Sequence, residues 1–279
     1  MSKRNRRTDQ GVISKRVDGG RGQGTGKGYT PWLHIQDVPS EGLVHRVKGW
    51  KTDREHHFLS TLECNYFYVL EWSPLVYDIR EQYPLLPVAE TLAIAEQCGF
   101  RHPADPKTKE FIVMTTDFVV TVATGNGKID CARAIKPSNK LQSTRVLEKL
   151  EIERRYWQAR NMDWGIVTER EIPQVLAQNI KLLHGHLQIG DRLPLTEKEI
   201  CSIASVLTPQ VAEGNISLRR AASDCDRQLG FEPGTSLTVA YHLLALRRWR
   251  IDMNTPIEPG RKLILANAAE LGQEDRGVP

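Results

Sequence analysis

Apolar and polar residues are arranged as two neighbouring β-like runs near the middle of the 279-residue chain, over residues 111–122 and 129–135. Between them, residues 124–127 read Thr-Gly-Asn-Gly, and asparagine and glycine favour the positive φ angles of a hairpin turn. The pattern therefore predicts a β-hairpin. An acid, Asp117, interrupts the first run, and Lys136 follows the second. Because charges are seldom buried without a partner or a function, this hairpin is also a candidate site.

Helical spacing and strand-like alternation predict further elements on both sides of the hairpin. Helices are expected over residues 58–72, where Glu63 lies on the apolar face, and over residues 142–161. Strands are expected over residues 76–85 and 164–168, and residues 88–110 form a surface insertion with a short helix. The resulting order, helix, strand, hairpin, helix, strand, predicts an α/β core with a mixed sheet.

Beyond about residue 170 the apolar spacing becomes helical throughout. Helices are predicted over residues 173–187, 196–207, 217–229 and 234–249, followed by two short β-runs at 250–253 and 262–266. This order favours a winged helix-turn-helix, whose recognition helix would carry Thr238, Tyr241, His242, Arg247 and Arg248. Such a module binds DNA or protein. Three parts are therefore expected: residues 1–30, a core domain over 31–170 and a helical domain over 171–279.

Composition excludes several classes of protein. No apolar run approaches the roughly 20 residues that span a bilayer, so no membrane contact is expected. The N-terminus has no apolar core after its charges and does not read as a secretory signal. The five cysteines are scattered without a CxxC pair, which argues against a disulfide framework or a zinc module and favours reduced thiols in a cytoplasm.

Positive charge is concentrated at the N-terminus. Residues 1–30 hold eight Lys or Arg and two Asp, a net +6, whereas the whole chain carries only +4. Many glycines separate these cations, so the segment is expected to be a flexible basic arm that contacts DNA phosphates, with a solubilising tail as the alternative. The cations are Lys3, Arg4, Arg6, Arg7, Lys15, Arg16, Arg21 and Lys27. A second group precedes the first predicted helix and is also expected to face phosphate: Arg46, Lys51, Arg54 and His56.

An acid and a lysine on one hairpin have the chemistry for phosphodiester hydrolysis. That reaction needs a divalent ion held by at least one fixed carboxylate, and a nearby lysine can orient the nucleophile and stabilise developing charge. Asp117 and Lys136 provide these groups, and Glu63 provides a second oxygen ligand from a neighbouring element. The pattern of acid, turn and lysine has little specificity by itself.

Several long strings in a fixed order make the indication specific. Within residues 20–170 they read GRGQGTGKGYTPWL, HRVKGWKTDREHHFLSTLE, LEWSPLVYDIREQYPLLP, TTDF, IKP and LEKLEIERRYW. In these strings the chain resembles the TnsA endonuclease family, the subunit of heteromeric cut-and-paste transposases that cuts the 5′ ends of the transposon. The resemblance implies a restriction-endonuclease-like fold of the PD-(D/E)xK group, followed by a helical domain of winged-helix type.

The resemblance also implies roles for single residues. Glu63, Asp117 and Lys136 would be the catalytic set, in which Asp117 bridges Mg²⁺ ions, Glu63 assists coordination and Lys136 serves the attacking water. The backbone carbonyl of Ile135 would be a further ligand, and Glu153 a weaker supporting acid. Mn²⁺ is expected to substitute for Mg²⁺. The implied partners, in a bacterial cytoplasm, are transposon-end DNA, a DDE transposase of the TnsB type and an AAA+ regulator of the TnsC type.

One position departs from the pattern of this nuclease group. Two residues before the lysine, where the group usually has Glu, Asp or Gln, the chain has Ala134, which offers no side-chain oxygen. Another group or water then completes the coordination, which is the favoured interpretation. The alternative is a non-catalytic subunit of the same kind of complex that binds DNA or serves as a scaffold.

Overall fold

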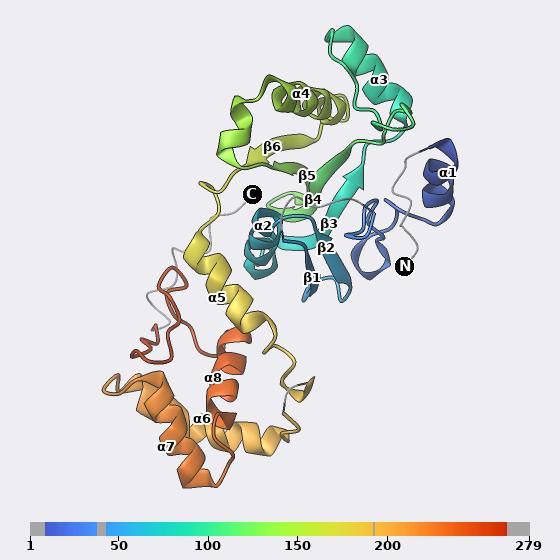
Figure 1. The fold of residues 1–279 in the computed structure, drawn as a ribbon. Helices are drawn as coiled ribbons and strands as arrows, with labels where there is room; N and C mark the ends of the chain where they lie inside the picture. Colours follow the sequence, from blue (N-terminus) through green and yellow to red (C-terminus); the bar gives the residue numbers. More distant parts are fainter. Residues whose placement is uncertain (1–8, 38–42, 192, 267–279) are drawn as a thin grey trace. The chain divides into compact units, whose positions relative to one another are not determined.

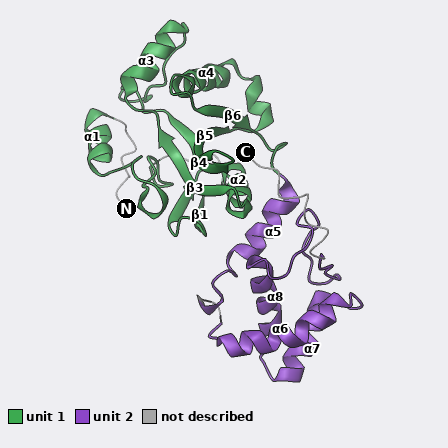
Figure 2. Ribbon diagram, turned by 180° about the vertical axis from the view of Figure 1, so that it is seen from behind, with its two compact units in different colours: residues 1–172, 278–279 green, residues 173–277 purple. Residues whose placement is uncertain are grey.

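The structure, a computed structural model, describes residues 9–37, 43–191 and 193–266. The chain divides into two compact units, the first ending at Ile172 and the second beginning at Pro173 (Figure 2). The division falls where the apolar spacing of the sequence becomes purely helical. Each unit has its own core and is described by itself.

A four-stranded mixed sheet is the centre of the first unit (Figure 1). Its order is β3-β4-β5-β6, with antiparallel pairing between the first three strands and parallel pairing between β5 and β6. The elements of this unit are α1 (Gln10–Asp18), β1 (His45–Lys48), β2 (Glu55–Phe58), α2 (Thr61–Trp72), β3 (Val76–Pro84), α3 (Val88–Gln97), β4 (Thr115–Thr124), β5 (Gly127–Ile135), α4 (Thr144–Gln158) and β6 (Asp163–Val167), with short 3-10 turns at Gly26–Gly28 and Ser138–Gln142. The predicted α/β class and mixed sheet are confirmed.

The predicted hairpin is formed by β4 and β5. Thr124 pairs with Gly127, so the turn has two residues, and Gly127 has a φ of 124°, which is open to glycine alone. The first strand begins at Thr115 rather than at residue 111, because the chain from 101 to 114 is an irregular loop. The hairpin is therefore shorter at its open end than its apolar pattern suggested.

Two helices cover opposite faces of the sheet. Ile152 and Trp157 of α4 pack with Val119 and Ala132 on one face. On the other face the Phe118 ring lies near the rings of residues from α2 and β2. Since residues 118 and 119 are consecutive in β4, their side chains point in opposite directions, which places α2 and α4 on opposite sides.

The glycine-rich N-terminal segment is ordered over residues 9–37, so the expectation of a flexible arm is wrong for residues 9–30; residues 1–8 lie outside the described residues. The segment lies beside β3 (Figure 1) and is held there by the Trp32 amide, which donates to the Gln82 carbonyl at 3.2 Å. A Cβ added to Gly22, at φ +76°, would lie 2.2 Å from Pro84 Cγ. One added to Gly24 would lie 2.5 Å from the Gly28 carbonyl oxygen. Glycine is needed at both positions because Pro84 and the Gly28 backbone lie where a side chain would begin.

The second unit is helical. It contains α5 (Gln174–His184), α6 (Glu197–Ala212), α7 (Leu218–Leu229) and α8 (Thr235–Ala245), with a short 3-10 turn at Ile189–Asp191. The turn between α7 and α8 is fixed by Asp226, whose carboxylate accepts from the amides of Gly234 and Ser236 at 2.8 Å each. The helices predicted from the sequence are present, with their ends shifted by a few residues.

Two features of the predicted winged helix differ in the structure. Tyr241 and His242 of the expected recognition helix are buried, because α8 is apolar on most sides and forms the core of this unit. Residues 250–266 contain no strand, and a single backbone hydrogen bond, from the Ala266 amide to the Arg250 carbonyl, joins the two expected β-runs. No helix within the described ranges is both long enough and apolar enough to cross a membrane.

Candidate active site

Asp117 and Lys136 meet at the end of the hairpin. Lys136 Nζ donates to Asp117 Oδ2 at 2.6 Å and to the Ile135 carbonyl oxygen at 2.9 Å. The Ile135 amide donates to the same Asp117 oxygen at 2.7 Å. Asp117 Oδ1 accepts no hydrogen bond from any residue that the structure describes. The predicted acid and lysine are thus in direct contact, and one carboxylate oxygen is left for another group.

Glu63 approaches from the N-terminus of α2. Ser60 caps this helix by accepting from the Glu63 amide, and the Glu63 carboxylate in turn accepts from Ser60 Oγ at 2.8 Å and from the Leu59 amide at 3.0 Å. The side chain is therefore folded back over the first turn in the manner of a capping box. A fourth contact comes from Gln82 Nε2, at 3.2 Å from Glu63 Oε2. Glu63 is buried although it is charged in water.

Glu153 reaches the same region from α4. Its side chain is buried, and Oε1 accepts a hydrogen bond from the indole of Trp164 at 3.0 Å. The charges of Asp117 and Lys136 both act on this carboxyl. The supporting acid that the family resemblance implied is therefore adjacent to the acid and lysine of the hairpin.

The two glutamates have strongly perturbed proton affinities. Burial raises the pKa of Glu63 to about 7, with a further rise from Asp117, against the opposing hydrogen bonds from Leu59 and Ser60 and the charge of Lys136. Burial and then Asp117 raise the pKa of Glu153 to about 7 as well. Burial alone would lower the pKa of Lys136, but Asp117, Glu153 and Glu63 together hold it above its ordinary value. Acidic and basic side chains with shifted pKa values that lie close together are typical of functional sites.

At Asp117 the side chains of β4 switch from one face of the sheet to the other, which is called here the exchange of faces. Residues two apart in a strand ordinarily share a face. Thr116 and Phe118 do not: Thr116 Oγ1 accepts from the Trp157 indole of α4 at 2.6 Å, whereas the Phe118 ring lies 5.4 Å from the ring of Tyr66 in α2. The acid between them can consequently be approached from both faces, which is why its charge raises the pKa of both Glu63 of α2 and Glu153 of α4.

The neighbouring strand undergoes the same exchange at Gln82. Glu81 lies against the β2 side, where its carboxylate pairs with Arg54 and His56, and Tyr83 lies on the α4 side, 5.6 Å from the Trp157 ring. Gln82, between them, has a φ of +50°, which is rare for a residue other than glycine. The sequence reasoning did not select Gln82; the signal for it is the polar pair Glu81-Gln82 inside an otherwise strand-like run.

Asp117 is flanked by Gln82 on one side and Ala134 on the other. On β3 and β4, Glu81 pairs with Phe118 and Tyr83 with Thr116, which places Gln82 opposite Asp117. Continuing the pairing of Phe118 with Arg133 places Ala134 opposite Asp117 on β5. Ala134 is fully buried. Asp117 therefore has no polar neighbour at Ala134 on β5 but has one at Gln82 on β3.

The oxygens of this site suit a hard divalent cation. The Lys136 ammonium is held between Asp117 Oδ2 and the Ile135 carbonyl oxygen, so these two atoms already converge on one positive charge. Oxygen donors of this kind are those that Mg²⁺ prefers. Across residues 9–37, 43–191 and 193–266, no three His, Cys, Asp or Glu side chains form a metal site by themselves. Coordination would therefore use the carbonyl and water together with the carboxylates.

Two of the residues expected to face phosphate are buried. Arg54 donates to both oxygens of Glu81, which is fully inaccessible, and His56 Nδ1 lies 2.8 Å from Glu81 Oε2. The expectation that Arg54 and His56 contact DNA is therefore wrong, because the buried Glu81 holds both side chains inside the unit. These contacts also fix β2 to β3 and so position the start of α2.

Other N-terminal cations have acidic partners within the unit. Arg21 pairs with Asp37 at 2.5 Å, and Arg16 lies 3.8 Å from the same carboxylate. Lys27 pairs with Asp53 at 2.6 Å but is largely exposed, and Arg46 lies 3.7 Å from Glu55 and is half-exposed. Lys15 is exposed and Lys51 partly so, while Lys3, Arg4, Arg6 and Arg7 lie outside the described residues.

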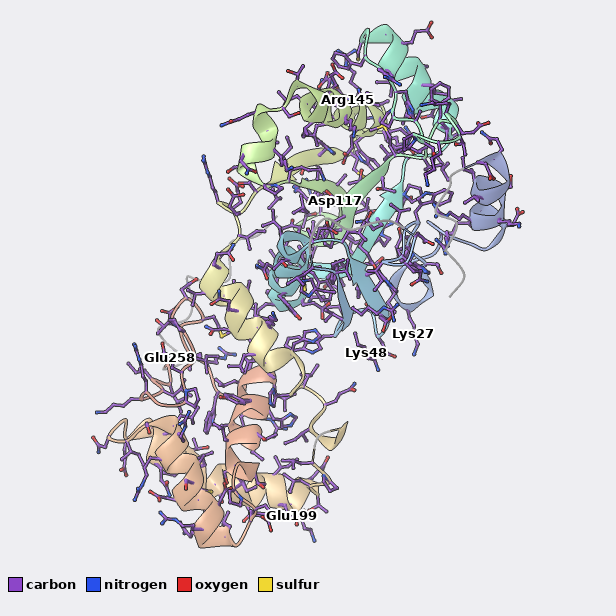
Figure 3. All side chains as sticks on the ribbon, in the orientation of Figure 1. Lys27, Lys48, Asp117, Arg145, Glu199 and Glu258 are labelled. Carbon is purple, nitrogen blue, oxygen red and sulfur yellow. The ribbon has the colours of Figure 1, made fainter. Side chains whose placement is uncertain are left out.

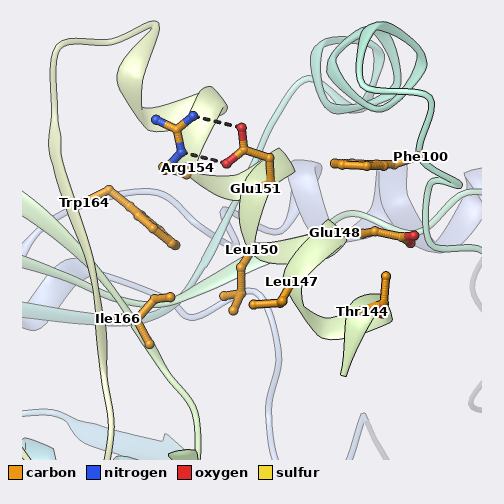
Figure 4. Close-up of a pocket in the computed structure, with 9 residues that line it drawn as sticks. All are labelled: Phe100, Thr144, Leu147, Glu148, Leu150, Glu151, Arg154, Trp164 and Ile166. Atoms are coloured by element: carbon orange, nitrogen blue, oxygen red, sulfur yellow. Dashed lines mark hydrogen bonds and ion pairs between the residues drawn. The ribbon is translucent and has the colours of Figure 1, made fainter. Parts of the chain in front are cut away.

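A hollow of about 380 Å³ lies on the α4 side of the unit, but Glu63, Asp117 and Glu153 do not line it. It is lined by apolar residues of α4 and β6, among them Leu147, Trp164 and Ile166, with the Glu151–Arg154 ion pair at its edge (Figure 4). Neither Asp117 nor Lys136 lines it. The candidate site is instead the convergence of the sheet with α2 and α4 around Asp117, in the middle of the unit (Figure 3).

Comparisons with known proteins identify the family of the chain. The chain is 46% identical over 184 residues to the Escherichia coli protein "Transposon Tn7 transposition protein TnsA", and the match spans 66% of each chain. Residues 73–169 match the family described as "TnsA-like endonuclease N terminal", which includes Asp117, Lys136 and Glu153 but not Glu63. Residues 171–253 match the family described as "TnsA endonuclease C terminal". The resemblance seen in the sequence is thereby confirmed, and the chain belongs to the TnsA endonuclease family.

Proposed function

We propose that this protein is a Mg²⁺-dependent DNA endonuclease subunit of a transposase, which cuts the 5′ ends of a transposon during cut-and-paste transposition. The observation that carries the proposal is the contact between Asp117 and Lys136 at the point where the sheet exchanges faces, with Glu63 and Glu153 buried on either side. Family membership supports the same reaction. The sheet and its helices are assigned to the restriction-endonuclease-like PD-(D/E)xK group on the same grounds.

The metal would be held by oxygen atoms alone. Asp117, Glu63 and the Ile135 carbonyl are the proposed ligands, Glu153 supports them, and Mn²⁺ would substitute for Mg²⁺ because it accepts similar ligands. When bound, such an ion activates water and neutralises charge on the scissile phosphate. Ala134 contributes no oxygen, and we assign its place to water held near Glu153.

The protein groups then have separate roles. Asp117 is the acid that both neighbouring helices approach, so its position is fixed from two sides. Lys136 carries a charge that Asp117, Glu153 and Glu63 stabilise, and its ammonium can hold the attacking water and the negative charge that develops on the phosphate. Without metal, Glu63 and Glu153 have pKa values of about 7, so each can bind or release a proton near neutral pH, and a bound cation would favour their ionised forms.

A row of side chains on α4 gives the DNA backbone a path to the site. Arg145, Lys149 and Glu153 are spaced four residues apart, so they follow one face of the helix. Burial, then the nearby charges of Arg145 and Lys136, lower the pKa of Lys149, so the three cations are close enough for their charges to interact. Two cations that lead to the catalytic acids fit a run of phosphates. Lys15, Lys27, Arg46 and Lys51 are the candidates for contacts farther along the duplex.

The proposed partners are transposon-end DNA, a TnsB-like DDE transposase and a TnsC-like AAA+ regulator. We assign the second unit to contact with a partner, through an α7 face that exposes Arg219, Arg220 and Arg227. A winged-helix kinship of this unit is part of the proposal. The reaction belongs in the bacterial cytoplasm, where DNA is present and five free thiols are stable.

A nicking assay tests the proposal. Purified protein, the two partner proteins and DNA carrying a transposon end are mixed with Mg²⁺, and 5′-end cutting is compared between wild type and Asp117→Ala. Asp117→Ala should abolish 5′ cutting and leave 3′ cutting by the partner transposase in place. Asp130→Ala, an acid on the same hairpin whose side chain pairs with Arg80 away from the site, is the matched control and should cut normally.

The second candidate is a non-catalytic subunit of the same complex, and Ala134 is the observation in its favour. Such a subunit would still be needed for assembly. Equal 5′ cutting by wild type and Asp117→Ala, together with loss of transposition when the protein is omitted, would establish it.

A further inference from the structure

Gln82 is a polar residue in the middle of a sheet with only 2% of its surface exposed. Its amide oxygen accepts from Thr115 Oγ1 at 3.4 Å, and its amide nitrogen donates to Glu63 Oε2 at 3.2 Å. The second of these bonds joins β3 to the N-terminal turn of α2. Among the described residues, it is the one hydrogen bond between the Glu63 side chain and the sheet that carries Asp117.

The backbone at Gln82 is held in an unfavourable conformation. A φ of +50° costs a residue with a side chain on the order of 1 kcal/mol relative to glycine. Two neighbours fix the backbone there: the Trp32 amide donates to the Gln82 carbonyl at 3.2 Å, and Tyr29 Oη donates to the Glu81 carbonyl at 3.0 Å. Glycine or asparagine would adopt this φ more easily. The choice of glutamine is therefore not explained by the local fold.

The position of Gln82 gives its side chain a use. The strand register places it beside Asp117, on the opposite side from Ala134. Among the described residues, Gln82 is the one strand residue that hydrogen-bonds to the Glu63 carboxylate, because the other hydrogen bonds of this carboxylate come from Leu59 and Ser60 of its own segment. An amide of this length spans the distance from the strand to the helix, whereas asparagine is one methylene shorter.

From these contacts we infer that Gln82 is a positioning residue, which holds the Glu63 carboxylate toward Asp117 from β3, on the side of Asp117 opposite Ala134. The inference rests on the proposed nuclease function. Partners that orient a metal-binding carboxylate change metal affinity or activity by roughly 10- to 100-fold when they are removed. Gln82 acts through Glu63 and is not itself assigned to the reacting atoms.

Two substitutions separate this role from a purely structural one. Gln82→Met keeps the length and the unbranched shape but has neither donor nor acceptor. Gln82→Asn keeps the amide, cannot reach Glu63, and relieves the positive φ. Lys109→Asn is the control, because Lys109 has a φ of +63° in an exposed loop away from the site.

Three quantities are measured on each protein: the rate of 5′ cutting in the complete assay as a function of Mg²⁺, the affinity of the isolated protein for Mn²⁺ by calorimetry, and the unfolding temperature without metal. Gln82→Met and Gln82→Asn should both cut about 10-fold or more slowly, bind Mn²⁺ about 10-fold more weakly, and need more Mg²⁺ for half-maximal rate. Gln82→Asn should unfold at the wild-type temperature or above it, as should Lys109→Asn, which should cut normally.

The inference is overturned if both Gln82 variants cut at the wild-type rate with unchanged Mn²⁺ affinity. It is also overturned if cutting falls only in proportion to a loss of folded protein in both variants. Asp117→Ala distinguishes this failure from failure of the proposed function, since full loss of cutting in Asp117→Ala with normal cutting in the Gln82 variants removes only the role of Gln82.

Discussion

Lys136 Nζ lies between Asp117 Oδ2 and the carbonyl oxygen of Ile135, at 2.6 and 2.9 Å. These two oxygens are also proposed ligands of the divalent ion, so in the proposed site the lysine and the ion compete for them. Both cations gain from the same negative charge. The affinity of the site for the ion should therefore depend on whether the lysine is present.

Replacing the lysine should separate metal binding from cutting. Lys136→Met removes the rival charge, so the protein should bind Mn²⁺ more tightly, by a few-fold or more, in a calorimetric titration. The same variant should lose 5′ cutting by at least about 100-fold, because the ammonium proposed to hold the attacking water and the developing charge is gone. Lys140→Met, an exposed lysine in the following 3-10 turn, is the control and should alter neither quantity. Weaker Mn²⁺ binding by Lys136→Met would contradict the competition.

The buried glutamates should make the metal-free protein less stable as pH rises. Glu153 has a pKa of about 7 in the folded protein and about 4.5 when unfolded, so between these values the folded state binds the extra proton. Stability is therefore lost as pH increases from about 4.5 to 7, and the full cost, on the order of a few kcal/mol, applies above pH 7.

Glu153→Gln tests this sign directly. Glutamine has the same shape without the charge, so in the presence of a chelator it should raise the unfolding temperature more at pH 8 than at pH 5. Glu148→Gln, at a partly exposed acid of the same helix that pairs with Arg145, should show no such pH dependence. An equal gain at both pH values would mean that the carboxyl is not the source of the cost. Cutting by Glu153→Gln should fall by about 10-fold or more.

The buried Glu81 should give the opposite dependence on pH. Burial opposes its charge, but His56 and Arg54 outweigh burial and hold the pKa of Glu81 well below its ordinary value. Its contribution to stability is therefore complete above the unfolded pKa of about 4.5 and is lost as pH falls below it. Glu81→Gln should destabilise the first unit by about 3–5 kcal/mol at pH 7 in denaturant unfolding, since it leaves Arg54 buried without a counter-charge. The penalty should shrink at pH 3. Glu55→Gln, an exposed acid in β2, should cost less than about 1 kcal/mol.

Glycines of the N-terminal segment should differ sharply in their tolerance of alanine. Gly22→Ala places a Cβ 2.2 Å from Pro84 Cγ at a positive φ, so it should destabilise the first unit by about 2–4 kcal/mol. Gly20→Ala has a similar φ but nothing within 4 Å, so its cost should be about 1 kcal/mol. Thermal unfolding of the two variants measures the difference. Two wild-type-like melting curves would restore the idea of a flexible segment.

Local pattern was sufficient for the hairpin and the helices. Alternation around Gly125 and Asn126 is a short-range signal, and the apolar spacing in α4 spans four turns, so neither depends on distant contacts. The acid and lysine of the site followed from the hairpin. Glu63 followed as an acid on an apolar helical face, although the cap that folds it back over Ser60 depends on the three-dimensional turn.

Other features required long-range contacts that no local pattern contains. Polar strands β1 and β2 were missed because His56 and Arg54 are buried by pairing with Glu81, 25 and 27 residues away. Glycine content suggested flexibility, whereas Gly22 is set by the proximity of Pro84, which is distant in sequence. Gln82 was missed because only the strand register and its positive φ angle distinguish it, and neither can be derived from the local sequence.

The exchange of faces at Asp117 makes the assembly of the candidate site depend on the order in which the chain is synthesised. As the chain leaves the ribosome, the hairpin with its acid and lysine emerges before residues 144–158 do, and until then one face of the sheet has no helix against it. Glu153 and the Trp157 contact to Thr116 arrive only with that helix. A nascent or truncated chain that ends before α4 would therefore carry Asp117 and Lys136 without Glu153 and without the helix that covers this face of the sheet.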